Sequence, residues 1–318
     1  MAHHDFSYYQ RSPPWSIWRR PCFNPLSPAF VDKNMDFLLA PFRYEFFSRA
    51  ILVGMMAGLL CGIMGVYITT RRMSYIAHGL SHAILGGAVL SYVLGLNFYI
   101  GSGIWGFAAA LLIQYLTGRK IYSDAAIGIV TTASFALGVA VISSYRKFSQ
   151  NFEAALFGNV LGVSPNDLWV VTGVTIVLLS LVFLFYRPLL FWCFDREVAQ
   201  VHGVPVFAMD TLFALMLATL LVATLNVLGV TLIISAVVIP ASIARLVSDR
   251  FAYLMIISGI LGTAISFIGI YFSYYLNIAS GASVVLLSTA IFACVLLTRN
   301  LQGRYKRRLP PLSTKHLP

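Results

Sequence analysis

The chain has 318 residues, a formal net charge of +11 and 59% hydrophobic residues, but only 10% charged residues. A soluble globular protein carries about 25% charged residues, so this composition excludes a soluble domain. The basic residues lie mostly in the tails and in short connections, as in membrane proteins, and we therefore expect no nucleic-acid partner. The cysteines contain no CxxC pair, which excludes a disulfide framework and a cysteine metal site.

Residues 1–45 are rich in proline and basic residues, and they contain no apolar run long enough for the core of a signal peptide. We expect them to form a basic, mostly disordered tail, in which Trp15 and Trp18 can touch lipid headgroups. Residues 46–298 are expected to form the transmembrane domain, and residues 299–318 a basic cytoplasmic tail.

The segment between the tails consists of continuous apolar runs near 20 residues long, which predict transmembrane helices. The fold class is therefore an all-α polytopic membrane protein with eight or nine transmembrane helices. The junction Asn226-Val-Leu-Gly229 is tight, so one member of the pair around it is broken or re-entrant in the eight-span alternative. The candidate spans are Phe46–Ile68, Ser74–Leu94, Phe98–Leu116, Asp124–Ile142, Trp169–Tyr186, Phe207–Asn226, Leu228–Val247, Ala252–Phe272 and Ser283–Thr298.

Positive charges in the connections indicate the orientation. Arg71-Arg72, Arg119-Lys120, Arg245…Arg250 and the C-terminal tail are all expected on the cytoplasmic side. Nine spans satisfy these assignments but place the basic N-terminal tail outside, a conflict that eight spans or an amphipathic tail segment would remove.

Two histidines stand four residues apart inside the second span. His82 lies roughly 15 Å beyond Arg72 along a helix, close to the middle of a ~30 Å hydrocarbon core. Residues i and i+4 share a helix face, so His78 and His82 are candidate metal ligands; hydrogen bonds to a neighbouring helix are the alternative. The small residues Gly79, Ala83 and Gly87 run beside them. We expect a second helix, or the same helix of a second subunit, to pack there and complete the coordination.

Two missing motifs narrow the function. The sequence His78-Gly-Leu-Ser-His82 has the spacing of H-E-x-x-H but carries Gly79 where a metalloprotease needs its glutamate, which argues against an enzyme. There is no GxxxxGK[ST] sequence, so any ATP hydrolysis must come from another subunit. In the connection Arg187–Val206, the segment Asp195–Gly203 is predicted to form a short helix on which such a subunit could dock.

Other polar and helix-breaking residues have open roles. Pro240 removes a helix hydrogen bond inside a span, either as a packing kink or as a bend that moves and gates a pathway. Ser164-Pro165-Asn166-Asp167 predicts a helix start. Asp210 lies three or four residues into a span and its role is ambiguous, whereas Asn226 and Gln114 are expected to form hydrogen bonds between helices.

An ordered set of motifs resembles the permease subunits of ATP-driven manganese, zinc and chelated-iron importers, a family of ABC transporters. The resemblance covers roughly Pro41 to Arg299. The motifs are Arg71-Arg72-Met73-Ser74, Leu80-Ser81-His82-Ala83, Ser123-Asp124-Ala-Ala-Ile-Gly128, Leu156-Phe157-Gly158-Asn159, Ser164-Pro165-Asn166-Asp167-Leu168, Phe194-Asp195-Arg196-Glu197-Val198-Ala199 with Gly203 and Pro205, and Gly229 with Pro240-Ala241 and Ala244-Arg245.

The resemblance implies a bacterial cell-membrane importer built from a homodimer of permeases, two cytoplasmic ATPase subunits and an external metal-binding protein. It places His82 at the metal-coordinating position of the family and His78 where an aspartate is usual. Imidazoles suit zinc and carboxylates suit manganese, so we expect zinc ahead of manganese, as a transported ion and not as a permanently bound cofactor. It also implies that the coupling segment, which presses into the ATPase, contains Asp195, Arg196, Glu197, Val198, Ala199 and Gly203.

Two other transporter classes remain as alternatives. An ABC importer of whole metal chelates needs a wide apolar cavity rather than a histidine pair. A stand-alone secondary metal carrier should work without ATPase partners and should show carboxylate relays in several spans, which this sequence lacks.

Overall fold

The computed structural model describes residues 40–119, 121–144, 158, 160–230 and 232–308, with side chains except at residues 161 and 302–308. Its contacts divide the chain into two units, residues 1–43 and 44–318. In the first unit only the short 3-10 helix η2 (Ala40–Arg43) is described. The predicted tail of residues 1–45 therefore lies mostly outside the described residues. In the second unit a single helix, α13 (Ser280–Arg308), continues into the predicted C-terminal tail.

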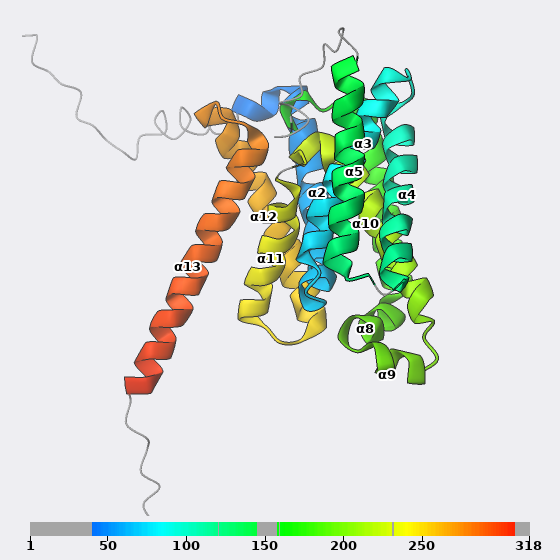
Figure 1. The fold of residues 1–318 in the computed structure, drawn as a ribbon. Coiled ribbons are helices and arrows are strands. Elements are labelled where there is room, and N and C mark those ends of the chain that lie inside the picture. Colours follow the sequence, from blue (N-terminus) through cyan, green and yellow to red (C-terminus); the bar gives the residue numbers. More distant parts are fainter. Residues whose placement is uncertain (1–39, 120, 145–157, 159, 231, 309–318) are drawn as a thin grey trace, which may run out of the picture. The chain divides into compact units, whose positions relative to one another are not determined.

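The second unit is all-helical over the residues that the structure describes, which confirms the predicted fold class (Figure 1). Eight of its helices are long and apolar enough to cross a membrane. They are α2 (Glu45–Thr70), α3 (Ser74–Val93), α4 (Phe98–Gly118), α5 (Ser123–Ser144), α7 (Pro165–Leu184), α10 (Val206–Leu228), α12 (Phe251–Leu276) and α13. Four shorter helices connect or supplement them: η3 (Val160–Gly162), α8 (Tyr186–Phe194), α9 (Arg196–Val201) and α11 (Ile233–Val247).

One of the nine predicted spans, Leu228–Val247, is a short helix. Continuous apolar sequence suggested a helix beginning at Leu228, but Leu228 ends α10 and α11 begins at Ile233. The reason is Gly229, whose positive φ of 74° ends α10. The 15 residues of α11 extend only about 22 Å, less than the ~30 Å hydrocarbon core. Over the described residues there are thus eight long helices and one short partner, as the tight junction at Asn226–Gly229 suggested.

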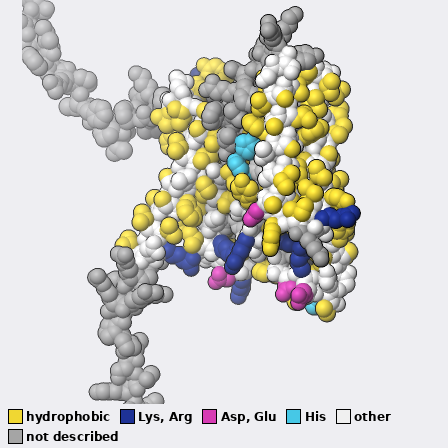
Figure 2. All heavy atoms as spheres, in the orientation of Figure 1, with side chains coloured by type: hydrophobic (Ala, Val, Ile, Leu, Met, Phe, Trp, Pro, Cys, Tyr) yellow, Lys and Arg dark blue, Asp and Glu magenta, His cyan; other side chains and the backbone are white. Residues whose placement is uncertain are grey.

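Basic side chains gather at one end of the second unit, called the basic end below (the lower end in Figures 1 and 2). Arg71 follows α2 there, Arg119 follows α4, and Arg245 in the last turn of α11 donates to Thr69 O at 3.3 Å. Although α11 is short, it brings the chain back to this end. The arrangement therefore agrees with the predicted common side for the basic connections.

Small residues let α2 approach α12 closely. A Cβ atom on Gly58 would stand 2.3 Å from Gly262 O, and one on Gly62 would stand 2.3 Å from Ser258 O. Ser258 Oγ donates to Gly62 O at 2.7 Å. Such contacts between small residues take the place of a hydrophobic driving force between helices in lipid. The result is a well-buried α2, whose last residue precedes Arg71 and the start of α3.

Candidate metal site and coupling segment

Helix α3 places the two histidines on one face, as predicted. The centroids of the His78 and His82 rings lie 4.7 Å apart, and the rings are nearly perpendicular at 83°. Both side chains are half-buried. Figure 2 shows histidine at the molecular surface between hydrophobic side chains, above the charged groups of the basic end. The pair therefore combines a largely apolar setting with access from one face.

The neighbours of the pair are mainly aromatic. The His78 ring lies 6.0 Å from the Tyr75 ring, one turn earlier on α3, and the His82 ring lies 5.8 Å from Phe135 on α5. His78 Nδ1 is buried and has no hydrogen-bond partner among the described residues. Within the described part of the chain, no group of three or more His, Cys, Asp and Glu side chains could hold a metal ion. Among the described residues, the candidate site thus consists of the two imidazoles alone.

The small residues beside the histidines contact helices of the same chain. A Cβ atom on Gly79 would stand 2.3 Å from Ile127 Cγ2 of α5, and one on Gly87 would stand 2.3 Å from Trp105 Cβ of α4. Of the two predicted occupants, a second helix of this chain is therefore present. This close packing orients α3 so that its histidine face stays partly open.

The break between α10 and α11 lies against the same turn of α3. Ser81, between the two histidines in sequence, has its Oγ 2.8 Å from His78 O and 3.3 Å from Val230 O. Val230 is fully buried in the non-helical link. Non-helical backbone at membrane depth is tolerated only where protein or a cavity covers it, and discontinuous helices often form ion sites. The sequence indicated the break but not its position beside the histidines.

The coupling segment forms a short helix, as predicted. The side chain of Asp195 caps α9 by accepting from the backbone N–H groups of Glu197 at 2.8 Å and Val198 at 3.2 Å. Gly203 ends the segment with a φ of 75°. Arg196 and Glu197 are exposed, Ala199 is buried, and Val198 and Val201 are 43% and 86% exposed. Exposed apolar side chains on a short capped helix suit docking to another protein surface.

Asp210 on α10 connects this segment to the beginning of α3. Its carboxylate accepts from Trp192 Nε1 at 2.8 Å, pairs with Arg196, and lies 3.6 Å from Arg71 Nη1. The Arg71 guanidinium also lies 3.9 Å from the centre of the Trp192 ring. Burial lowers the pKa of Arg71 from its ordinary value, and the carboxylate of Asp210 opposes that change. The role of Asp210, open from sequence, is therefore to pair two arginines at the basic end.

Pro240 lies buried inside α11, as predicted. Because proline has no backbone N–H, the carbonyl of Ala236 receives no helix hydrogen bond from position 240. The Val237 carbonyl faces α2 so closely that a Cβ atom on Gly65 would stand 1.9 Å from its oxygen. This part of α11 is thus packed against α2; a kink at Pro240 and its movement as a gate stay predictions.

Several other polar residues are not metal ligands in this arrangement. Burial raises the pKa of the Cys193 thiol to about 11, which disfavours the thiolate that metals bind. Gln114 Nε2 donates to Phe207 O at 3.5 Å, and Asn226 Nδ2 donates to Tyr99 Oη at 3.4 Å. These two contacts confirm the expected bonds between helices.

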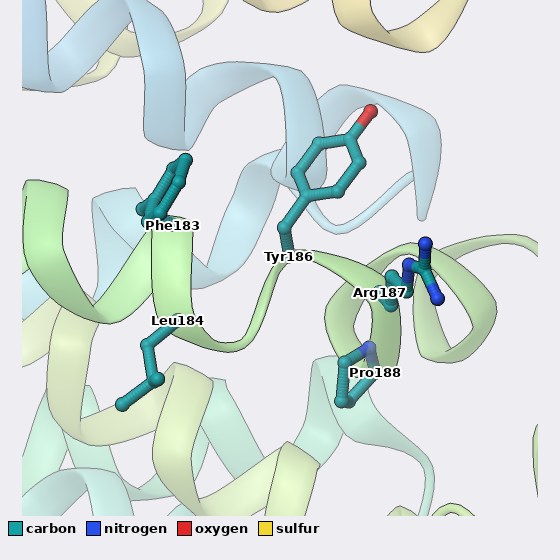
Figure 3. Close-up of a pocket in the computed structure, with 5 residues that line it drawn as sticks. All are labelled: Phe183, Leu184, Tyr186, Arg187 and Pro188. Atoms are coloured by element: carbon teal, nitrogen blue, oxygen red, sulfur yellow. The ribbon is translucent and has the colours of Figure 1, made fainter.

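Two pockets open near the basic end. One, of about 440 Å³, lies below the first turn of α3 and is lined by residues that include Arg71, Tyr75, Asp124 and Asp210. The other, of about 570 Å³, lies at the α7–α8 junction and is lined by Phe183, Leu184, Tyr186, Arg187 and Pro188 (Figure 3). The second pocket has no histidine or carboxylate in its lining, so it offers nothing typical of a metal site.

The helices and the histidine face define a class: a multi-pass membrane permease. The model of the ABC 3 transport family matches residues 43–299, and the chain belongs to this family. This confirms the resemblance seen in the sequence. The chain is thus a transport subunit of the kind found in bacterial ABC importers and is not itself the ATPase.

Curated relatives and solved structures agree with the family. The manganese transport system membrane protein MntC of Halalkalibacterium halodurans is 37% identical over 261 residues, covering 82% of this chain and 89% of the relative. A probable iron transport system membrane protein of Haemophilus influenzae is 34% identical, covering 84% and 97%. The structure of PsaBC from Streptococcus pneumoniae in complex with Fab matches with a TM-score of 0.74 and 32% identity, covering 83% of this chain and 95% of that chain.

Proposed function

We propose that this chain is the permease of an ATP-driven importer of divalent transition-metal ions, and that His78 and His82 bind the ion in transit. The observation that carries the proposal is the pair of half-buried imidazoles, 4.7 Å apart, beside a helix break in a chain of this family. Neutral imidazole is a good ligand for first-row divalent metals. The similarity to transporters named for manganese and iron supports the substrate class.

The ion itself is zinc or manganese in this proposal. Two imidazoles and no third candidate ligand in the described part of one chain favour zinc, which accepts nitrogen ligands readily. The relatives named MntC and ScaB favour manganese. Competition between the two ions for one transporter distinguishes these alternatives.

The site is completed by a second copy of the chain. The open side of the histidine face supports this part of the proposal, because two copies facing each other offer four imidazoles where one offers two. The ATPase partners dock on Asp195–Gly203, where Val198 and Val201 are exposed, and an external metal-binding protein delivers the ion.

The test is uptake and binding of Mn²⁺ and Zn²⁺ by the chain assembled with its ATPase partner in liposomes. The double variant His78→Ala, His82→Ala should lose uptake and bind both ions at least about tenfold more weakly. His202→Ala removes an imidazole outside α3 and should leave metal binding by the chain unchanged; because His202 lies in the proposed docking segment, only its metal binding serves as the control. Normal uptake by the double variant would exclude the proposed site. Uptake without any ATPase partner would favour a secondary carrier instead.

A further inference from the structure

Helices α3 and α5 lie side by side and run in the same direction. A Cβ atom on Gly79 would stand 2.3 Å from Ile127 Cγ2, and one on Gly86 would stand 2.2 Å from Ser134 O. From the first contact to the second, both helices advance by seven residues in the same direction, so the two helices are parallel. The contact of His82 with Phe135, at 5.8 Å between ring centroids, belongs to the same interface.

Thr131 occupies the place opposite His78. It precedes Phe135 by four residues on α5, as His78 precedes His82 on α3, and residues four apart share a helix face. In parallel helices, the offset that relates His82 to Phe135 therefore relates His78 to Thr131. A separate contact agrees, because a Cβ atom on Gly79, the residue after His78, would stand 2.8 Å from Thr131 Oγ1.

Both residues carry a buried polar atom that lacks a partner. His78 Nδ1 and Thr131 Oγ1 have no hydrogen bond within the described part of the chain. Threonines inside other helices donate to the carbonyl four residues earlier, for example Thr175 of α7 to Val171 O at 2.7 Å and Thr224 of α10 to Leu220 O at 2.8 Å. Buried polar groups are normally satisfied, so an unpaired donor and acceptor on facing positions need an explanation.

We propose that Thr131 is a positioning residue of the metal site: when the ion binds, His78 donates its Nδ1–H to Thr131 Oγ and coordinates through Nε2. The inference rests on the proposed function. A metal-binding histidine almost always donates its other ring N–H to an acceptor, which fixes the tautomer and the ring orientation.

A hydroxyl acceptor suits an ion that must leave again. A carboxylate in this place would add negative charge and raise the basicity of the imidazole, and both effects hold a cation more tightly. The hydroxyl of Thr131 is neutral, so it orients His78 without adding charge. With this neutral partner, His78 should hold the ion less tightly than with a carboxylate partner, which suits an ion that is transported.

The test compares three variants of the full chain in complex with its ATPase partner, with Mn²⁺ and Zn²⁺ as probes in equilibrium dialysis. Thr131→Val keeps the shape and removes the hydroxyl, and should weaken binding about 10–100-fold. Thr131→Ser keeps the hydroxyl and should stay within about threefold of the wild type. Thr132→Val makes the same change at the next, exposed residue of α5 and should have no effect.

A double-mutant comparison separates positioning from a general structural role. If Thr131 acts through His78, Thr131→Val should weaken binding in the wild type but not further in His78→Ala. Equal weakening in both backgrounds would overturn the inference. If Thr131→Val lowers the melting temperature without metal, metal binding by Thr131→Ser and by Thr131→Ala is compared instead. These two variants differ only in the hydroxyl, so the inference requires weaker binding by Thr131→Ala. Wild-type binding by Thr131→Val with loss in His78→Ala, His82→Ala would refute the Thr131 role alone, whereas wild-type binding by both would refute the metal site as well.

Discussion

Asp210 and Asp167 lie at opposite ends of the second unit, and their carboxylates are held by partners of different kinds. Asp210 at the basic end pairs with Arg71 and Arg196. Asp167 at the other end accepts from Tyr99 Oη and from Ser164 Oγ and N, both at 2.9 Å, as part of the cap of α7.

The two aspartates differ in the charge of their partners, and this difference affects how each cluster stabilises its end of the unit. The poorly exposed Arg71 brings a charge that must be matched, so the Asp210 cluster depends on the carboxylate of Asp210 remaining in place. Asp167 accepts hydrogen bonds from neutral donors, namely Ser164 at the start of α7 and Tyr99 of α4. This cluster therefore joins the two helices without an ion pair. The charged cluster includes Arg196 of the coupling segment, whereas the neutral one lies away from it. If the ATPase docks on the coupling segment as proposed, the charged cluster is the one of the two that its binding would reach.

Among the variants of the two clusters, removal of Asp210 should cause the largest losses of stability and uptake. Arg71 is only 12% exposed and Asp210 15%, so Asp210→Ala leaves a poorly solvated guanidinium without its partner. We expect a loss of about 3 kcal/mol in the free energy of unfolding, together with loss of ATP-driven uptake. Denaturation in detergent and uptake in liposomes measure these. Asp124→Ala, an exposed aspartate at the start of α5, should cost less than about 1 kcal/mol.

Removing Asp167 should come next. Asp167→Ala deletes half of a capping box and the acceptor of Tyr99, for an expected loss of about 2 kcal/mol. Because the partners are neutral, the loss should be the same at low and high salt. A loss that shrinks strongly in high salt would contradict the distinction between the two clusters.

Tyr99→Phe should produce a smaller effect at the same end. The ring remains packed, Asp167 keeps its two contacts with Ser164, and only the hydroxyl contacts with Asp167 and Asn226 disappear. We expect about 1 kcal/mol of lost stability, and metal-dependent uptake close to that of the wild type. A complete loss of uptake would show that the neutral cluster also takes part in transport.

Arg196→Gln should have the smallest effect on stability and a selective effect on function. The Arg196 side chain is 54% exposed, and exposed ion pairs contribute less than about 1 kcal/mol. If the charged cluster transmits the motion of the ATPase, this variant should hydrolyse ATP while importing less metal. Equal losses of hydrolysis and uptake would indicate that the ATPase no longer binds.

Local patterns predicted the helices and the shared face of His78 and His82, because apolar runs and i,i+4 spacing act within one segment. The predicted beginning of the seventh span at Leu228 was wrong, because hydropathy does not reveal the positive φ at Gly229 that ends α10. The charged cluster was missed because it joins residues from four segments around Asp210. A carboxylate a few residues into an apolar span is costly, and this cost was the available signal that a basic partner had to exist.

The contact of Arg71 with Asp210 anchors the chain just before α3. The displacement of the two histidines that follows from a tilt of α3 about this point can be estimated. At about 1.5 Å per residue, His78 lies roughly 6 Å and His82 roughly 12 Å along α3 from Ser74, its first residue. A tilt of about 10° about the start of α3 displaces the first imidazole by about 1 Å and the second by about 2 Å. Metal–nitrogen bonds are about 2.1 Å long, so if the two histidines bind an ion as proposed, a displacement of this size would be comparable to a bond length and would alter its coordination.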